Sequence, residues 1–477
     1  MAVTYDAIVV GAGPNGLAAA ITLQQAGLSV LLLEGKNEVG GGLSTLELTL
    51  PGFLHDTCSA VHPLAVLSPF FQSLPLQQYG LSYLYPDVQA AHPLDDGSTA
   101  VLLKGLPETA ALLGEDEIVY KKELQSVTDD WPLIDRELLG PLHFPGKPLA
   151  MARFGMKALP SAQYFAKRFA TGKARALWAG MAAHAVQPLD QPATSAIGLV
   201  LLAAAHLAGW PVPQGGSASI AKALAGYFVA IGGKIETGFY VRELKQLPAA
   251  RAILFDVSPR QLLGIAGHKF SAVYQWQLQR YKYGMGVFKI DWALDDAIPF
   301  VNEECRRAGT VHLGNTFEEI AANEQATSRG QHPDRPFVLL AQQSIIDTTR
   351  APLGKHTAWA YCHVPNGSTV DMTERIEQQV ERFAPGFKDQ IIARHTMNTE
   401  QLETHNPNYI GGDVNGGSLH ISQLFTRPAL RYSPYRTSAK GLYICSASTP
   451  PGGGVHGMGG YNAAKQALKD IFKITIN

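Results

Sequence analysis

The chain contains 477 residues, of which 46% are hydrophobic and 17% are charged, and its formal net charge is −1 at pH 7. This length is too great for one small hydrophobic core, so we expect a globular protein with two or three lobes rather than a disordered chain. The balanced charge gives no reason to expect a nucleic-acid partner.

The cysteines and the apolar segments narrow the class of protein further. The four cysteines are scattered without a CxxC pair, at Cys58, Cys305, Cys362 and Cys445. This pattern argues against a disulfide scaffold, a zinc site and a dithiol redox centre, and it is typical of a reducing cytosol. Met1–Tyr5 lacks the basic region of a signal peptide, and no uncharged apolar segment reaches the ~20 residues that span a bilayer without a proline or polar interruption. We therefore expect a cytoplasmic protein without a metal site.

A glycine-rich turn between two apolar runs is the first strong signal. The run Ala7–Val10 leads into Gly11, Gly13 and Gly16, and a second run, Val30–Leu33, ends on Glu34. The three glycines allow a tight turn, close approach to a pyrophosphate and close packing of helix on strand, and the helix N-terminus attracts the phosphates. An acid at this spacing suits a ribose. The pattern predicts a dinucleotide site formed by Gly11, Gly13, Pro14, Asn15, Gly16 and Glu34.

A second glycine run, Gly40–Gly42, follows the acid and precedes Leu43. It suggests a loop that passes close to an extended ligand, which FAD needs and a nicotinamide cofactor does not. These residues resemble the FAD-binding start shared by amine oxidases, phytoene desaturases and Rab GDP-dissociation inhibitors. The segment Pro51–Asp56 resembles the phytoene desaturase-like branch, in which it runs near the flavin ring, whereas amine oxidases usually carry Arg in place of Leu43.

This resemblance implies that FAD is the cofactor and that Gly41, Gly42 and Leu43 contact it. It also makes His55 and Asp56 candidate catalytic bases by their motif position. A packed histidine is an equally good interpretation of His55.

The middle of the chain changes in charge. The window from Leu138 to Leu189 contains no Asp or Glu, and the stretch from Gln191 to Ala221 contains no charged residue at all. The first window holds seven basic residues among aromatic and methionine side chains: Lys147, Arg153, Lys157, Lys167, Arg168, Lys173 and Arg175. Such a pair of segments is typical of a helix in a membrane interface, which predicts peripheral membrane contact through residues 147–215. The alternative is a solvated face beside a buried helix at Ala196–Leu207. His184 and His206 are interpreted as core or surface histidines rather than ligands.

The chain then turns back towards the dinucleotide domain. After a helix and the turn Gly232-Gly233, a strand is predicted at Ile235–Val241, and the resemblance implies that the backbone at Val241 contacts adenine. A buried strand at 252–257 follows almost directly, without the β-hairpin meander that many relatives insert. Met285–Trp292 alternates as a strand, which places Lys289 on the same face as Val287 and Asp291. A lysine that faces a flavin can hold a water near its N5, and a solvated or salt-bridged lysine is the alternative.

A second glycine-rich helix start lies near the C-terminus. The strand Gly441–Ser446 leads into the turn Pro450–Gly457 and then into a helix at Asn462–Leu468. Such a helix start accepts negative charge. The resemblance implies that this element binds the flavin end of FAD, with the helix N-terminus facing the pyrimidine carbonyl. It implies contacts from Ser446, Gly454, Val455 and Gly457, and a third candidate base at His456.

Two glycine-rich helix starts at opposite ends of the chain predict one long cofactor held across a discontinuous domain. The predicted fold class is α/β, with a discontinuous Rossmann-like FAD-binding domain, a mixed-sheet substrate domain and a helical part that can face a membrane. The expected FAD-binding segments are 1–70, 209–290 and 435–477, and the expected substrate segments are 71–208 and 291–434. Strands at Phe337–Gln342 and Trp359–Val364, a helix at Thr373–Phe383 and a loop at Asn406–Gly417 fall within the last of these.

The resemblance implies an FAD-dependent oxidoreductase that desaturates, dehydrogenates or isomerises an apolar isoprenoid- or polyene-like substrate. The sequence has no second GxGxxG motif, which argues against a reductase that draws on NAD(P)H, so a quinone and oxygen stay open as electron acceptors. Two other functions also stay open. One is a non-catalytic escort protein for a lipid-modified partner, which the intact glycines disfavour, and the other is an amine oxidase.

Overall fold

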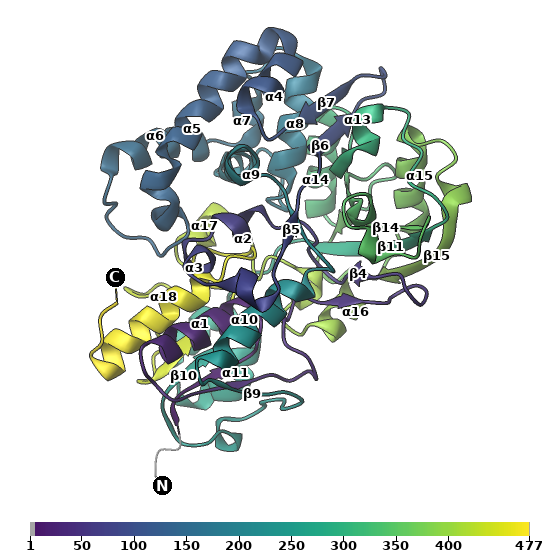
Figure 1. Cartoon of the computed structure of the whole chain (residues 1–477). Helices are drawn as coiled ribbons and strands as arrows, with labels where there is room; N and C mark the ends of the chain where they lie inside the picture. Colours follow the sequence, from purple (N-terminus) through teal and green to yellow (C-terminus); the bar gives the residue numbers. More distant parts are fainter. Residues whose placement is uncertain (1–4, 477) are drawn as a thin grey trace.

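Two sheets organise the computed structural model, which describes residues 5–476 (Figure 1). Residues 1–4, on which the expectation about a signal peptide mainly rests, and residue 477 lie outside the described residues. Figure 1 shows the smaller sheet at the bottom beneath its helices, the larger sheet at the right and a group of helices at the upper left.

The smaller sheet is entirely parallel and joins distant parts of the sequence. Its strand order is β16–β10–β1–β2–β9. The strands are β1 (Tyr5–Val10), β2 (Val30–Leu33), β9 (Lys234–Glu236), β10 (Ala250–Phe255) and β16 (Leu442–Ile444). The central strands are short apolar runs because helices cover the sheet on both sides. This arrangement confirms the discontinuous Rossmann-like domain.

Helices cover both faces of this sheet. One face carries α1 (Pro14–Gln25), α10 (Ala218–Ala230) and α18 (Met458–Ala467), and the other carries α11 (Pro259–Ala266) and α12 (Ala272–Gln279). The helices α1 and α18, purple and yellow in Figure 1, cross so closely that a Cβ on Gly460 would stand 1.7 Å from the Asn15 carbonyl oxygen. The beginning and the end of the chain therefore form one packed layer.

The predicted strand Ile235–Val241 is shorter than expected. β9 ends at Glu236, and Gly238 then adopts a φ of +72°, in the region that favours glycine. The chain turns there, and the Phe239 N–H donates to the Glu34 carbonyl oxygen at 2.8 Å. The turn carries Val241 over the end of β2 instead of extending the sheet.

The larger sheet has seven strands in the order β15–β11–β14–β13–β12–β6–β7. Only the β6–β12 pair is parallel, among these described strands. The strands are β6 (Val88–Pro93), β7 (Thr99–Leu102), β11 (Gly286–Leu294), β12 (Ala308–Leu313), β13 (Val338–Ala341), β14 (His356–Val364) and β15 (Ile391–Met397). One face packs against α13 (Glu303–Arg306) and α15 (Thr373–Phe383). The expected boundary between the FAD-binding segment 209–290 and the substrate segment 291–434 falls inside β11. Because β11 belongs wholly to the larger sheet, the substrate segment begins earlier than expected.

The helices at the upper left of Figure 1 form a third packed group. They are α4 (Leu106–Leu112), α5 (Glu117–Leu138), α6 (Pro148–Ala158), α7 (Ala162–Ala166), α8 (Gly172–Ala183) and α9 (Thr194–Ala208). α9 covers the stretch predicted as a buried helix, and Leu199 and Leu202 lie in the core of this group. Among residues 5–476, no helix has the length and apolar character needed to cross a bilayer.

Acids from other parts of the chain neutralise part of the positive charge of the basic window 138–189. Four of its seven cations form ion pairs with acids outside the window: Arg153 with Asp130, Lys157 and Arg168 with Glu123, and Arg175 with Glu318. The other three, Lys147, Lys167 and Lys173, form no ion pair with the described residues. The acid-free window is therefore partly neutralised by α5 and by α14 (Phe317–Ser328).

Short elements complete the fold around the two sheets. They are β3 (Thr45–Leu46), β4 (His55–Asp56), β5 (Tyr83–Leu84), β8 (Val212–Pro213), α2 (Pro63–Leu67), α3 (Pro69–Gln72), α16 (Thr399–His405) and α17 (Ile421–Leu424). β3 pairs with β4 and β5 pairs with β8, both antiparallel.

Candidate functional site

A pocket of about 590 Å³ runs from the carboxyl end of the smaller sheet to one face of the larger sheet. This volume lies in the range of sites for small molecules and cofactors. Ligands of open parallel sheets bind at the carboxyl ends of the strands, so the position agrees with the predicted dinucleotide site.

The glycine-rich turn forms the floor of the pocket. Gly11, Gly13, Pro14 and Asn15 line it. Gly16 lies beneath, where an added Cβ would stand 1.9 Å from the Gly11 carbonyl oxygen. α1 begins at Pro14, which has no N–H, and the Gly16 N–H donates to Asp256, so the Asn15 N–H is the first-turn donor left to an anion.

Glu34 is fixed at the end of β2. Its Oε2 accepts from the Ala12 N–H at 2.7 Å, and its Oε1 accepts from the Lys36 N–H at 2.9 Å. Glu34 lines the pocket together with Phe239 and Val241. A carboxylate held beside the glycine-rich turn, with an apolar slot beyond it, suits a ribose followed by a base.

Asp256 is a pocket residue that the sequence reasoning missed. Its Oδ2 accepts from the Gly16 N–H at 2.8 Å, and a Cβ on Gly13 would stand 2.7 Å from the same oxygen. Burial, together with the nearby charge of Glu34, raises the pKa of Asp256 to about 7. The available signal was an acid at the carboxyl end of a buried parallel strand, which is where ligands of such sheets bind.

The predicted flavin end is also lined by its two glycine-rich segments. Gly41, Gly42 and Leu43 line one side, and Gly41 lies so near the first turn that an added Cβ would stand 3.1 Å from the Gly13 Cα. Ser446, Gly454 and Val455 line the other side. Gly457, the residue before α18, caps the helix without a side-chain hydrogen bond. The Met458 N–H donates to His456 Nδ1 and the Gly460 N–H donates to Asn15 Oδ1, so in the first turn of α18 it is the Gly459 N–H from which no described residue accepts.

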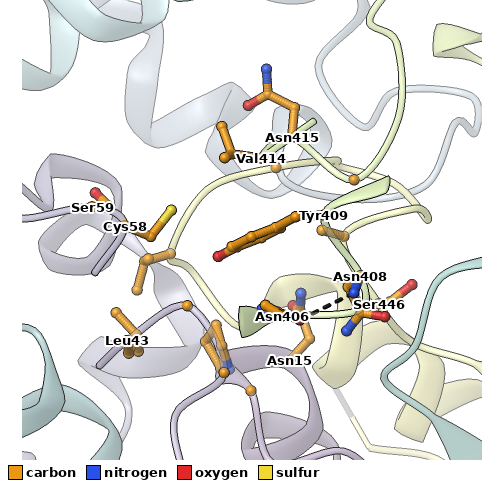
Figure 2. A pocket seen from close by; sticks show the side chains of 18 of the residues that line it. Asn15, Leu43, Cys58, Ser59, Asn406, Asn408, Tyr409, Val414, Asn415 and Ser446 are labelled. Atoms are coloured by element: carbon orange, nitrogen blue, oxygen red, sulfur yellow. Dashed lines mark hydrogen bonds between the residues drawn. The ribbon is translucent and has the colours of Figure 1, made fainter. Parts of the chain in front are cut away.

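The loop Asn406–Gly417, to which the sequence assigned no role, lies in the pocket. Figure 2 shows the Tyr409 ring across the middle of the pocket, between Cys58 and Ser59 on one side and Asn408 and Ser446 on the other. Asn406 and Asn408 lie beside it, and the Asn408 N–H donates to the Asn406 side-chain oxygen at 3.1 Å. The turn residues of this loop predicted its irregular backbone but not its position.

Beyond this end the pocket widens into an apolar chamber. Its floor is one face of the larger sheet and its wall is α9; the chamber residues are Ile197, Val200, Leu201, Trp210, Val287, Lys289, Thr310, Leu339, Trp359 and Tyr361. The opposite face of the sheet is a separate apolar core. The chamber is thus a space between two independently packed layers.

Lys289 is the charged side chain on the chamber floor, and it is fully paired. It is buried, and its Nζ donates to both Asp291 carboxylate oxygens at 2.5 Å. The two residues share a face of β11, as the alternation of the strand predicted. Lys289 is therefore salt-bridged, as the alternative interpretation expected, and it also lines the pocket; a role beside the flavin stays a prediction.

Of the described residues that line the pocket, none is His55, Asp56 or His456. Each of these three side chains is buried and contacts residues outside the pocket lining. The His55 Nε2 lies 2.8 Å from Thr49 Oγ1, Asp56 is ion-paired with Arg350 at 2.9 Å, and the His456 Nδ1 accepts from the Met458 N–H at 3.1 Å. Burial lowers the pKa of His55 and of His456 to about 4. The three side chains therefore lie outside the pocket lining, and their role as bases stays a prediction.

The two histidines of the middle segment, His184 and His206, lie in different environments. His184, interpreted from the sequence as a packed histidine, lines the chamber. His206 lies outside the lining, where its Nε2 is 2.8 Å from the Tyr120 hydroxyl. Position in the sequence could not distinguish them, because the partners of His184 come from the distant strand β12.

Comparison with known proteins places this geometry in context. Residues 9–74 match a family model described as an NAD(P)-binding Rossmann-like domain. The chain is 26% identical to pyridine nucleotide-disulfide oxidoreductase domain-containing protein 2 of Mus musculus, over 98% of this chain and 94% of that protein. It is 22% identical to a component of the limonene dehydrogenase of Castellaniella defragrans, over 98% and 95% of the two chains. A solved structure of putrescine oxidase superposes with a TM-score of 0.62 at 17% identity, over 98% and 99% of the two chains.

The chain shares the fold of the putrescine oxidase structure, and FAD is the cofactor that this pocket fits. The fit rests on two glycine-rich helix starts at the pocket, on glycines that bring two loops into contact, and on a carboxylate at the end of β2.

Proposed function

We propose that the protein is an FAD-dependent dehydrogenase of an apolar, isoprenoid-like substrate. The observation that carries this proposal is the chamber, whose walls are mainly aliphatic and aromatic and which is continuous with the cofactor pocket. The carboxylates that line the whole pocket, Glu34 and Asp256, both belong to its dinucleotide end. An apolar body would displace water from the chamber and bury apolar surface there.

The relative from Castellaniella defragrans supports the substrate class, because limonene is an isoprenoid hydrocarbon. Its match extends over nearly the whole of both chains, so it includes the residues that form the chamber. The phytoene desaturase-like resemblance of Pro51–Asp56 points to the same chemistry.

The reaction we propose removes a hydride and a neighbouring proton from two carbons of the substrate, which become doubly bonded. FAD, when bound, supplies the ring that accepts the hydride. The chamber walls orient the substrate and exclude water. Lys289 places a fixed positive charge at the boundary between the chamber and the cofactor pocket, and Asp291 holds it there.

His62 lines the same pocket, and we assign it the role of taking the proton. The Ser217 hydroxyl donates to the Ser59 carbonyl, so the His62 Nε2, 2.8 Å from Ser217 Oγ, is the donor of that hydrogen bond. Its Nδ1 then carries the lone pair, and it has no hydrogen-bond partner among the described residues. Burial lowers the pKa of His62 to about 4, so the ring is neutral at physiological pH. A neutral imidazole can act as a base, although a low pKa makes it a weak one.

Amine oxidation is the second candidate function. The stacked rings of Trp359 and Tyr361, with centroids 5.6 Å apart, would suit an amine, and the putrescine oxidase structure shares the fold. The Lys289 ammonium lies 5.6 Å from the centre of the Trp359 ring and would repel a protonated amine there. For this reason we rank the amine second.

Anaerobic reduction of the bound flavin tests the proposal. The purified flavoprotein is mixed with limonene, farnesene, cyclohexylamine or putrescine, and absorbance near the flavin maximum is followed. We expect the isoprenoids to bleach the flavin and the amines to leave it oxidised, and re-oxidation with oxygen or a quinone then identifies the acceptor. Bleaching by amines with release of peroxide would support the second candidate instead. Colourless protein that releases no flavin on denaturation would point to an escort protein.

We also propose that residues 139–158 contact a membrane surface. Phe144 and Leu149 in this segment are 86% and 78% exposed, and the unpaired Lys147 lies between them. Apolar side chains beside a cation suit the boundary of an anionic bilayer. Flotation with anionic vesicles should recover the wild type and the control Ile118→Ser, which changes an exposed side chain of α5, but not Phe144→Ser/Leu149→Ser. Equal flotation of all three proteins would contradict the proposal.

A further inference from the structure

A row of four residues crosses the chamber floor. The sheet register pairs Lys289 with Tyr361, Tyr361 with Leu339, and Leu339 with His312. Directly paired residues point to the same face of a sheet, so all four side chains belong to the chamber side. Three strand spacings place the backbones of Lys289 and His312 about 14 Å apart across this face.

A histidine pair lies at the far end of the row. His184 follows α8 and lines the chamber, and its Nε2 is 3.1 Å from the Nε2 of His312. The Trp210 ring packs edge-on against both imidazoles, with centroid distances of 5.9 Å and 6.2 Å. Phe337 also packs against His312, the aliphatic residues of α9 complete the wall, and His92 and His363 are further polar side chains near the pair.

The pair suits neither a metal ion nor an anion. The described residues contain no group of three or more His, Cys, Asp or Glu side chains that could hold a metal. Burial and the nearby His363 lower the pKa of His184 to about 3. Burial, His184 and His92 hold the pKa of His312 well below its ordinary value. Both rings are therefore neutral at physiological pH and offer no positive charge to a carboxylate.

The hydrogen-bond pattern indicates which nitrogen carries each proton. One proton lies between the two Nε2 atoms, and the His312 Nδ1 is buried without a partner among the described residues. A buried N–H without an acceptor is rarer than a buried acceptor without a donor. The His312 proton is therefore on Nε2 and is donated to His184, whose own proton must then be on Nδ1. No described residue accepts from this Nδ1–H, which is left to a ligand.

We propose that the substrate carries one neutral oxygen function, which accepts a hydrogen bond from His184 at the far end of an otherwise apolar body. This inference rests on the proposed function, because it concerns the same chamber. The oxygen function is a hydroxyl, an ether or a carbonyl group, and it lies at the His312 end of the row, opposite the end that carries Lys289. His184 contacts the substrate and determines specificity, while His312 is a positioning residue that sets the tautomer of His184.

Four probes with one carbon skeleton test the proposal on the flavin-bound wild type. Farnesol donates and accepts a hydrogen bond, farnesyl methyl ether only accepts, farnesene does neither, and farnesoate carries a charge. Binding is measured by equilibrium dialysis and by the shift of the flavin spectrum. We expect farnesol and the methyl ether to bind about tenfold more tightly than farnesene, and farnesoate to bind no better than farnesene. Farnesene binding as tightly as the methyl ether would overturn the proposal, as would the failure of all four probes to bind.

Two variants and a control assign the effect to the histidine pair. His184→Phe should abolish the preference of both oxygenated probes over farnesene, and His268→Phe, at an exposed site outside the pocket, should preserve it. His312→Leu frees His184 to adopt either tautomer, so the methyl ether should lose affinity while farnesol keeps it. An unchanged preference in His184→Phe would overturn the assignment.

Anaerobic bleaching of the flavin separates this inference from the proposed function. If the probes bind in the expected order but none reduces the flavin, the oxygen subsite is supported and the proposed dehydrogenase fails. If all the probes reduce the flavin but bind equally, the dehydrogenase is supported and the subsite is overturned.

Discussion

The Gly16 N–H donates to the Asp256 carboxylate at 2.8 Å, although the two residues are 240 positions apart in the chain. This contact joins β10 to the glycine-rich turn and places a buried acid beneath the surface that a pyrophosphate would occupy. Because the pKa of Asp256 is raised to about 7, the folded protein binds a proton there more tightly than the unfolded chain does.

The contribution of Asp256 to stability should therefore fall as the pH rises from about 4 to about 7. A pKa difference of about 3 corresponds to a loss on the order of 4 kcal/mol at pH 8. Asp256→Asn keeps an oxygen for Gly16 and removes the titration. In urea unfolding of the flavin-free protein, we expect the variant to be more stable than the wild type at pH 8 and similar to it at pH 4. Parallel pH profiles for the two proteins would contradict the prediction.

Gly16→Ala should abolish FAD binding. The added Cβ would stand 1.9 Å from the Gly11 carbonyl oxygen, so the turn must open and its N–H groups must move. We expect purified protein with less than about a hundredth of the wild-type flavin affinity, since each 1.4 kcal/mol lost is a tenfold change. Gly264→Ala in α11 is the matched control, because its Cβ would meet no atom within 4 Å. Normal flavin content in Gly16→Ala would refute the role given to the turn.

Lys289→Met should slow flavin reduction by about a hundredfold, the order of effect seen when a preorganised charge is removed from an active site. The variant also leaves the Asp291 carboxylate buried without its ammonium partner, with His55 Nδ1 at 3.7 Å and His395 Nδ1 at 3.8 Å. Stopped-flow reduction and flavin content should be measured together. A double variant, Lys289→Met/Asp291→Asn, should recover stability but not rate. Recovery of the rate would show that Lys289 acts only through packing.

His62→Leu should lower the rate of flavin reduction while substrate affinity changes little. The His62 Nδ1 is the lone pair that we assign to proton removal, whereas the apolar walls supply most of the binding. General base catalysis contributes about 10²–10⁴-fold, and we expect a loss near the lower end of this range because of the low pKa of His62. The rate and the half-saturating substrate concentration should be determined separately. A loss of affinity with an unchanged limiting rate would make His62 a binding residue.

The cofactor end could be predicted from the sequence because its requirements are local. A strand, a glycine-rich turn and a helix follow one another within a few residues at both Gly11–Gly16 and Gly452–Gly457. The alternation of side chains along β11 is also a local property, and it correctly predicted that Lys289 and Asp291 share a face of the strand.

The chamber could not be predicted in this way because its chemistry depends on distant pairs. His184 meets His312 across 128 positions, and Asp56 meets Arg350 across 294 positions. Nothing near Asp56 in the sequence reveals a buried guanidinium, so its proximity to the flavin segment suggested a base. Tyr409 was likewise hidden in a loop whose turn residues specify backbone shape and not position.

Asp56→Asn tests whether this carboxylate is a base or a structural ion. It accepts hydrogen bonds from Arg350 at 2.9 Å, from Thr45 Oγ1 at 2.7 Å and from the Ser217 N–H at 2.7 Å. Burial alone would raise the pKa of Asp56, but Arg350 and these donors hold it below its ordinary value, so the carboxylate stabilises the fold above that value.

Breaking one side of a buried ion pair costs about 3–5 kcal/mol, because the partner charge stays buried. We therefore expect Asp56→Asn to unfold at a clearly lower urea concentration than both the wild type and Asp190→Asn, a control at an exposed acid. The fraction of the variant that retains flavin should be reduced by substrate at nearly the wild-type rate, because Asp56 does not line the pocket. Wild-type stability combined with lost reduction would show instead that the carboxylate is the catalytic base.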